Sequence, residues 1–175
     1  VQQHHDADDE ERLVLQQAPQ PVQSQHNFTK IEVVNADCID VVVEMVRNEG
    51  LDPIVMDAAS REFFGGGYKN GASAQEEELC RRSTLPFLCD PSIQFQRTNH
   101  FPLPPRDGVY IPNVKFFRMG AAQGYRLMEE PVTCAVGAIA AHRQPQLDPV
   151  TGKMQPNDVE DAKAMIETFF TMAKK

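Results

Sequence analysis

Residues 61–80 read REFFGGGYKNGASAQEEELC, and this stretch decides how the rest of the sequence is interpreted. Three consecutive glycines, Gly65, Gly66 and Gly67, come soon after an apolar run at 53–59 that is too short for a helix and predicts a buried strand. Glycines at the carboxyl end of a strand in an α/β sheet lie where ligands bind, because backbone without a Cβ can approach a phosphate closely. By itself, a triple glycine is more often an ordinary flexible turn.

A helix rich in acidic residues is expected after the glycines. Ser73 and Glu76 have the spacing of a capping box, in which each residue satisfies a backbone N–H of the first turn. Glu77 would lie on a mixed face that is partly directed inward, whereas Glu78 would be solvated. A carboxyl group beside an apolar wall suits general-acid work on a glycosidic bond. The bland alternative is a surface helix whose acids interact only with its dipole.

The residues before the glycines predict a strand, a helix and a second strand. The stretch FTKIEVV at Phe28–Val34 contains β-branched residues in partial alternation and predicts a strand. Asp37 is a candidate helix cap, because apolar residues at 39, 42, 43 and 46 recur at helical spacing until Asn48-Glu49-Gly50. With the strand over Pro53–Ala59, this order predicts a β-α-β unit with a parallel pair.

The residues after the acidic helix are less regular. Residues 90–113 contain five prolines and lack periodicity, which predicts either a lid or a solvated loop. Val132–Ala141 is a run of small and apolar residues that predicts another buried strand. Asn157 or Asp158 is expected to cap a last helix with an apolar stripe. The stripe consists of Ala162, Met165, Ile166, Phe169 and Phe170.

Composition limits the classes of partner. The 175 residues carry a formal net charge of −8, and residues 1–27 contribute −4 of it, from five acids against Arg12. We interpret residues 1–27 as a flexible polar tail and residues 28–175 as one folded domain. A negative field disfavours binding to duplex nucleic acid or to an anionic membrane surface, and no apolar run is long enough for a membrane span. The oligomeric state is left open.

Four cysteines, at 38, 80, 89 and 134, are far apart in the sequence. They form no C-x-x-C pair, so neither a zinc site nor a disulfide scaffold is predicted, and no metal or cofactor is expected. No signal peptide opens the chain. These observations predict reduced thiols and an intracellular location, in the cytoplasm or the nucleus.

The motif Gly65-Gly66-Gly67, seven residues, then Gln75-Glu76-Glu77 resembles the G-G-G-x₆₋₈-Q-E-E signature of poly(ADP-ribose) glycohydrolases of the microbial type. The resemblance covers roughly residues 30–145 and includes the segments 55–60, 70–77, 82–83, 110–114, 117–118 and 130–131. Three departures stand out. Phe63-Phe64 replaces the usual Asn-Pro, Asp57 replaces an Asn, and Ile111 replaces a Ser.

This resemblance implies a macrodomain, a three-layer α/β/α sandwich with a mixed, largely parallel sheet, that hydrolyses ribose–ribose O-glycosidic bonds of poly(ADP-ribose). Glu77 matches the catalytic glutamate, and Glu76 would hold the neighbouring ribose hydroxyls. The substrate is implied to be poly(ADP-ribose) or ADP-ribosylated protein. The expected substrate-binding residues are Gly65, Gly66, Gly67, Gln75, Asp57 and Tyr68. The alternatives are a module that binds ADP-ribose without hydrolysing it, or an inactive fragment.

The two ends of the sequence suggest a fragment. The chain begins with Val1, and it lacks the second glycine-rich segment, G-x-x-G-C-G-x-F, that the resemblance leads us to expect after one further strand. We therefore expect a domain truncated at its C-terminus that binds ADP-ribose weakly, hydrolyses slowly and exposes the face formed by Phe169 and Phe170.

Overall fold

The computed structural model describes residues 29–93, 101–140 and 145–174. The chain divides into two units, residues 1–35 and residues 36–175, and each is described by itself. In the first unit only residues 29–35 are described, so the polar tail predicted at 1–27 lies outside the described residues.

The strand predicted over Phe28–Val34 is wrong for residues 29–34, which form neither helix nor strand. Ile31 is 84% exposed and Val33 is 92% exposed, so their side chains bury almost no surface. The β-propensity of branched residues reflects their packing on a half-buried pleated surface, and that packing does not occur here. The predicted β-α-β unit is wrong as well, because its first strand is not formed.

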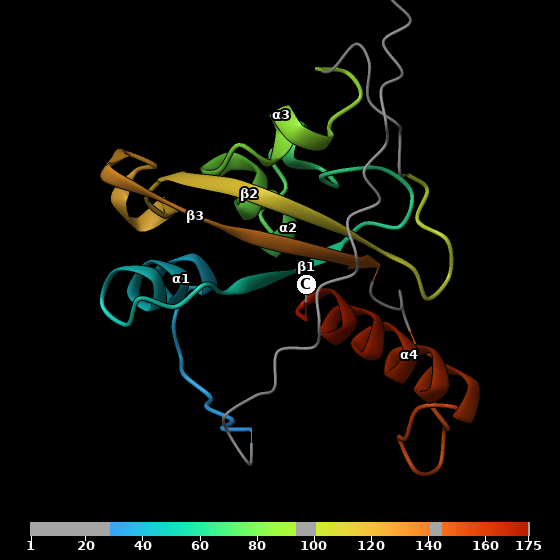
Figure 1. Ribbon diagram of the computed structural model, residues 1–175. Helices are drawn as coiled ribbons and strands as arrows, with labels where there is room; N and C mark the ends of the chain where they lie inside the picture. The colour runs from blue at the N-terminus through green and yellow to red at the C-terminus, as the bar shows by residue number, and fades with distance from the viewer. Residues whose placement is uncertain (1–28, 94–100, 141–144, 175) are drawn as a thin grey trace, which may run out of the picture. The chain divides into compact units, whose positions relative to one another are not determined.

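The second unit contains a three-stranded sheet in the order β1-β3-β2 (Figure 1). β1 spans Ile54–Ala59, β2 spans Gly108–Arg118 and β3 spans Leu127–Ala140. β1 is parallel to β3, whereas β2 is antiparallel to it, so the sheet is mixed. The strands predicted at 53–59 and 132–141 are confirmed as β1 and as the described second half of β3.

β2 lies partly within the segment that was predicted as a lid or loop, so that prediction is wrong for residues 108–113. Pro112 argues against a strand when the sequence is considered alone. The proline is tolerated because β2 is at the edge of this sheet. The pairing register also shifts between Ile111 and Val114, and Asn113 has φ of 58°. Such a bulge interrupts the alternation by which a strand is recognised.

Helices cover both faces of the sheet and make three layers (Figure 1). Alternate residues of β3, including Val136 and Ala138, face a core shared with three helices, whereas Ile139 faces the other side. Those helices are α1 (Cys38–Arg47), α2 (Gln75–Arg82) and α3 (Leu85–Cys89), and α4 (Pro156–Met172) packs on the opposite face. Two short 3₁₀ turns, η1 (Tyr68–Asn70) and η2 (Ala121–Gln123), complete the described elements.

The predicted cap of α1 also anchors α2. Asp37 accepts hydrogen bonds from the N–H groups of Ile39 and Asp40, as the sequence predicts. Its carboxylate also forms two 2.9 Å bonds with the guanidinium of Arg82, a side chain that is fully buried. Arg82 further contacts Asp40 at 3.3 Å and the backbone oxygen of Arg118 at 3.2 Å. One arginine thus joins α1, α2 and the end of β2.

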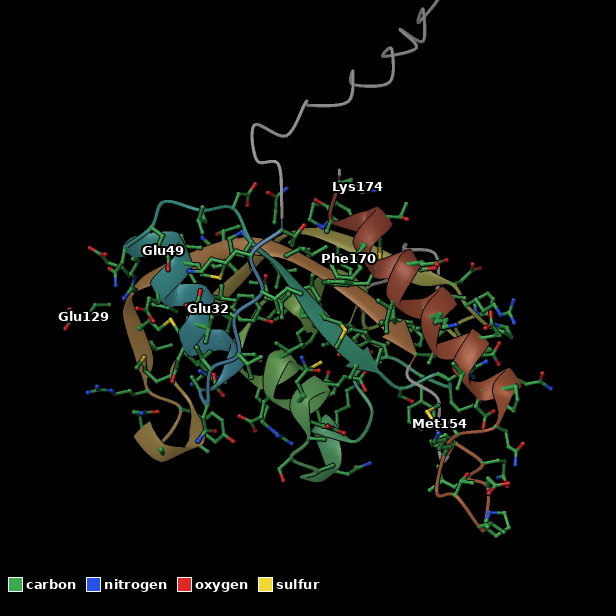
Figure 2. The ribbon with its side chains drawn as sticks, turned by 90° about the horizontal axis from the view of Figure 1, so that it is seen from below. Glu32, Glu49, Glu129, Met154, Phe170 and Lys174 are labelled. Carbon is green, nitrogen blue, oxygen red and sulfur yellow. The ribbon has the colours of Figure 1, made fainter. Side chains whose placement is uncertain are left out.

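The last helix, α4, begins at Pro156, one or two residues before the predicted caps. Proline is favoured in the first turn, where its missing N–H would have no intrahelical partner. Met165 lies in the core between α4 and the sheet, and Phe169 packs so closely on Gly137 that a Cβ there would be 3.0 Å from its ring. The prediction that both phenylalanines are exposed is therefore wrong for Phe169, whereas Phe170, labelled in Figure 2, is 60% exposed.

Candidate active site

The carboxyl end of β1 and the first turn of α2 place three acidic residues together. Val55, Asp57 and Ala59 of β1 are buried on the face toward α2. The chain then forms the glycine loop, residues 60–74, and returns so that Glu76 and Glu77 lie in the first turn of α2. The sequence order of strand, glycines and acids thus produces a carboxylate cluster at the end of β1.

Glu76 is 5% exposed, and both its carboxylate oxygens accept backbone hydrogen bonds. Oε1 accepts from the N–H of Gly65 at 2.9 Å, and Oε2 accepts from the N–H of Ser60 at 2.8 Å. Burial raises the pKa of Glu76, the two N–H donors oppose that rise, and the charge of Glu77 adds to it. Glu76 therefore fixes the path of the glycine loop as it leaves β1.

Glu77 is 7% exposed and is held in the same manner by the other side of the loop. Its Oε1 accepts from the N–H of Gly67 at 2.9 Å, and its Oε2 accepts from the N–H of Ala74 at 3.1 Å. The predicted capping box of Ser73 and Glu76 is wrong, because α2 begins at Gln75 with Ala74 as its N-cap. The glutamate that reaches back to the cap is Glu77, since Glu76 is engaged by the loop.

Gly66 lies between the two carboxylates. A Cβ at this position would be 2.6 Å from Oε1 of Glu77 and 2.9 Å from Oε2 of Glu76. Its φ is 51°, in the left-handed region that side chains disfavour. Glycine is thus required here both by backbone conformation and by the approach of the two glutamates. The N–H groups of Gly65 and Gly67 are directed at these glutamates.

Gln75 attaches α2 to the edge of β1. Its Nε2 donates to the backbone oxygen of Met56 at 2.6 Å, and its Oε1 accepts from the N–H of Ala58 at 2.9 Å. These two bonds fix the first residue of α2 against the strand. The adjacent glutamates are positioned as a consequence.

Asp57 is the most deeply buried acid of the cluster, with 1% of its surface exposed. Its Oδ1 has no hydrogen-bond partner among the described residues. Burial raises the pKa of Asp57 to about 8, and repulsion from Glu76 and then Glu77 contributes to the rise. The resemblance implies that Asp57 contacts a ribose, and this stays a prediction; its side chain is buried on the same face of β1 as Val55 and Ala59.

Tyr68 contacts Asp90, a residue that the sequence analysis did not identify. Its hydroxyl donates to Oδ2 of Asp90 at 2.6 Å, and Lys69 forms a 2.6 Å ion pair with the same oxygen. Ser92 donates to Oδ1 of Asp90 from both its N–H and its hydroxyl. Burial opposes the charge of Asp90, but the donors from Lys69, Tyr68 and Ser92 outweigh burial and lower its pKa. The D-x-S spacing of an Asx turn was the available signal.

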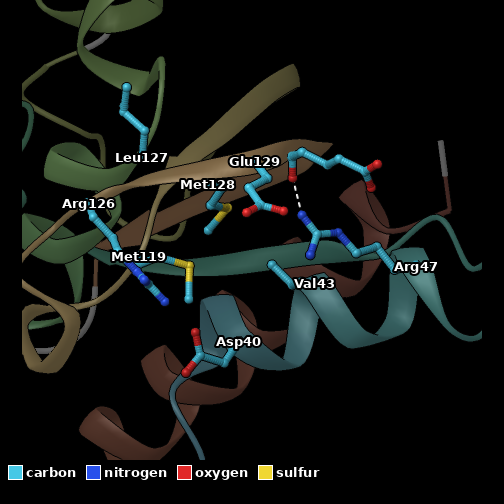
Figure 3. Close-up of a pocket in the computed structure, with 9 residues that line it drawn as sticks. Asp40, Val43, Arg47, Met119, Arg126, Leu127, Met128 and Glu129 are labelled. Carbon is cyan, nitrogen blue, oxygen red and sulfur yellow. Dashed lines mark hydrogen bonds between the residues drawn. The ribbon is translucent and has the colours of Figure 1, made fainter.

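A cavity of about 510 Å³ lies elsewhere, between α1 and the first residues of β3 (Figure 3). Leu127–Glu130 precede the part of β3 that pairs with β1, so this cavity is on the amino-terminal side of β1, away from the glycine loop. Arg47, which donates to the backbone oxygen of Glu130, and Arg126 line it together with Asp40 and Glu129. Its charges have both signs, which does not favour a polyanion.

The described residues include no group of three or more His, Cys, Asp or Glu side chains that could hold a metal ion. Within the part of the chain that the structure describes, no helix has the length and apolar character needed to cross a bilayer. All four cysteines are free thiols. Burial raises the pKa of Cys134 to about 12 and raises the pKa of Cys80 further, so both thiols are neutral.

This chain is similar to proteins of known family. Residues 2–119 match the family described as microbial-type PARG, catalytic domain, where PARG denotes poly(ADP-ribose) glycohydrolase. A comparison with curated proteins found no match.

Solved structures of poly(ADP-ribose) glycohydrolases are similar to this chain. The enzyme from Thermomonospora curvata bound to the inhibitor ADP-HPD has 26% identity and a TM-score of 0.56, with 78% of this chain and 52% of that chain covered. A second structure of the Thermomonospora curvata enzyme has 27% identity and a TM-score of 0.57, with 80% and 52% covered. The enzyme from Deinococcus radiodurans in complex with ADP-ribose has 24% identity and a TM-score of 0.45, with 77% and 51% covered. This chain spans about half the length of these structures.

The fold and the site define a mixed α/β protein with a pair of buried glutamates held over a glycine loop. The chain belongs to the microbial-type poly(ADP-ribose) glycohydrolase catalytic-domain family.

Proposed function

We propose that this chain hydrolyses the ribose–ribose O-glycosidic bonds of poly(ADP-ribose) and releases ADP-ribose. The observation that supports the proposal most directly is the placement of Glu76 and Glu77, whose four carboxylate oxygens are held by backbone N–H groups of residues 60–74. A pair of fixed, buried carboxyl groups beside a glycine loop supplies what hydrolysis of a glycosidic bond needs, a proton donor and a positioned hydroxyl acceptor.

Glu77 is assigned as the catalytic acid and base. It would protonate the leaving ribose oxygen as an oxocarbenium-like centre develops, and then accept a proton from the attacking water. Each of its oxygens accepts one N–H bond and keeps a second lone pair for these steps. Because the loop fixes the carboxyl group before substrate arrives, little reorganisation is needed in the transition state.

Glu76 and Gln75 are assigned supporting roles. Glu76 would accept hydrogen bonds from the ribose hydroxyls next to the scissile bond, using the lone pairs that Gly65 and Ser60 leave free. Gln75 would act as a positioning residue through its two bonds to β1. The resemblance also assigns the backbone of Gly65 to Gly67 and the side chain of Tyr68 to substrate binding.

The proposed substrate is poly(ADP-ribose), free or attached to modified proteins, and the scheme uses no cofactor. Local contacts would hold this polyanion, because the protein has a formal net charge of −8 and does not attract anions at long range. We also propose the macrodomain assignment and an intracellular location, in the cytoplasm or nucleus. Free thiols, including the exposed Cys38, are typical of such compartments.

The test is release of ADP-ribose from automodified polymer by the wild-type chain, by Glu77→Gln and by Glu78→Gln. Glu78 is the matched control, because it neighbours Glu77 in α2 but pairs with Arg81 and Tyr125. We expect release by wild type and Glu78→Gln and a loss of at least about 100-fold in Glu77→Gln, which is the usual contribution of a general acid. Equal release by wild type and Glu77→Gln would remove Glu77 from the mechanism.

Binding of ADP-ribose, measured by calorimetry on the same samples, separates hydrolysis from recognition. If wild type binds ADP-ribose but releases none from polymer, the chain is a binding module and the hydrolytic proposal is wrong. If hydrolysis is lost in Glu77→Gln while ADP-ribose binding is retained, Glu77 acts in the chemical step and not in ground-state binding.

A further inference from the structure

Asp57 presents an unusual combination of charge, burial and unsatisfied hydrogen bonding. It is 1% exposed, and its Oδ1 has no partner among the described residues. Its neighbours in the sheet supply no cation, since its partner in β3 is Ala138. The groups of α2 that act on it electrostatically are Glu76, Glu77 and Cys80, which are two acids and a neutral thiol. An ionised carboxylate in such a place would be uncompensated, and that state is costly.

The hydrogen bonds decide where a proton would reside in this cluster. Glu76 and Glu77 each accept two backbone N–H bonds, which hold both carboxyl groups in place. Oδ1 of Asp57 accepts none from the residues that the structure describes. Glu76 and Glu77 both repel a charge on Asp57, and Asp57, whose Oδ1 has no donor among the described residues, gains most from protonation.

We propose that Asp57 holds a proton at neutral pH and is a positioning residue for the glutamate pair, so that the three carboxyl groups carry no more than two negative charges. Ionisation of Asp57 would add a negative charge to this cluster and weaken the fixed arrangement of Glu76 and Glu77 in the loop. The positioning role rests on the proposed function of the two glutamates. The proton on Asp57 is a property of the folded chain and is tested separately.

The first test is urea unfolding of wild type and Asp57→Asn between pH 5 and pH 9. Asparagine keeps the shape of the side chain and is neutral at every pH. If folded Asp57 keeps its proton up to a pH of about 8 while the unfolded chain loses it near its ordinary pKa of about 4, folding takes up one proton in between. The unfolding equilibrium constant of wild type should then rise about tenfold per pH unit relative to Asp57→Asn, and level off above about pH 8.

The matched control is Asp107→Asn, which removes an exposed aspartate just before β2. Its stability should follow the wild-type pH profile. If Asp57→Asn also follows the wild-type profile, with a constant offset from pH 5 to pH 8, the proposal is overturned.

Infrared spectroscopy provides a readout that does not depend on how stable the variant is. Wild type should show the carbonyl band of a protonated carboxyl group at pH 7 that disappears as the pH rises through about 8. The band should be absent in Asp57→Asn and present in Asp107→Asn. A wild-type spectrum without this band at pH 7, or a band that persists in Asp57→Asn, contradicts the assignment of the proton to Asp57.

Hydrolysis of polymer tests the positioning role. The rate of wild type should fall above a pH of about 8, and in Asp57→Asn this descending limb should move to higher pH, whatever the maximal rate of the variant. An unchanged limb overturns the positioning role. If neither wild type nor Asp57→Asn hydrolyses polymer at any pH, the proposed function fails. The unfolding and infrared results then still decide whether Asp57 holds the proton.

Discussion

Gly66 lies against Glu77 so closely that a Cβ added to the glycine would be 2.6 Å from Oε1 of the glutamate. We predict that Gly66→Ala displaces the carboxylate and abolishes release of ADP-ribose. Its φ of 51° adds a backbone cost of about 1–2 kcal/mol for a residue with a side chain. Urea unfolding and the polymer assay measure the two effects.

Gly124→Ala is the control for backbone strain. Gly124 has φ of 64°, and a Cβ there would meet no atom within 4 Å. This variant should lose about 1 kcal/mol of stability and keep the wild-type rate of release. Equal loss of release in both variants would show that strain, and not the contact with Glu77, is responsible.

Arg82 is the buried junction between α1, α2 and β2, and its loss should destabilise the fold. Arg82→Met keeps the apolar stem but leaves two carboxylates without their partner. Because Asp37 and Asp40 are 40% and 52% exposed, water can replace part of the lost interaction. We expect a loss of about 2 kcal/mol, below the range of about 3–5 kcal/mol for a fully buried pair.

The comparison for Arg82 is Arg106→Met, which breaks the exposed pair of Arg106 and Asp161. An exposed pair contributes less than about 1 kcal/mol. Urea unfolding at neutral pH compares the two variants. A loss in Arg82→Met as small as that in Arg106→Met would mean that the buried arginine does not join these elements energetically.

The ionised form of Asp90 should stabilise the glycine loop in a pH-dependent way. Its lowered pKa means that this stability is present above the ordinary aspartate pKa of about 4 and is lost as the pH falls toward the folded-state pKa. Asp90→Asn should therefore cost about 1–3 kcal/mol at pH 7, and the difference from wild type should shrink below about pH 4. Thermal unfolding from pH 7 to pH 2 measures it. A difference that stays constant over this range contradicts the prediction.

Phe169 and Phe170 are adjacent, yet their substitution should have different effects. Phe169→Ala removes a half-buried ring that packs on Gly137 and should cost about 2 kcal/mol. Phe170→Ala removes a ring that is 60% exposed, so it should cost less than about 1 kcal/mol and should reduce self-association. Unfolding and light scattering measure these effects. Similar losses of stability in both variants would contradict the assignment of faces on α4.

Local signals in the sequence predicted the elements that depend on neighbouring residues. Asp37 predicted the start of α1, the short apolar run predicted β1, and the apolar stripe predicted α4. Pairing of β1 with β3 could not be predicted, because it joins residues far apart in the chain and leaves no local pattern. β2 was missed for the opposite reason, since Pro112 and the bulge at Asn113 give a misleading local pattern.

In the candidate site, too, the sequence predicted some features and not others. The order of strand, glycines and glutamates in the sequence was enough to place Glu76 and Glu77 beside the glycine loop. Their hydrogen bonds were not predictable, since donors such as Ser60 and Ala74 act through backbone N–H groups that every residue except proline carries. Likewise, the sequence singles out Asp57 as an acid, but only the structure shows that no donor from the described part of the chain reaches its Oδ1.

The side-chain amide of Gln75 forms the kind of hydrogen bonds with β1 that the backbone of a neighbouring strand would form. Its amide occupies the oxygen of Met56 and the N–H of Ala58, the same backbone groups that an added strand would need at the edge of β1. Another chain that pairs with this edge must therefore displace Gln75 or stop before Met56. The residue that attaches α2 to the sheet thus also protects the end of β1 nearest the glutamates from unwanted strand addition.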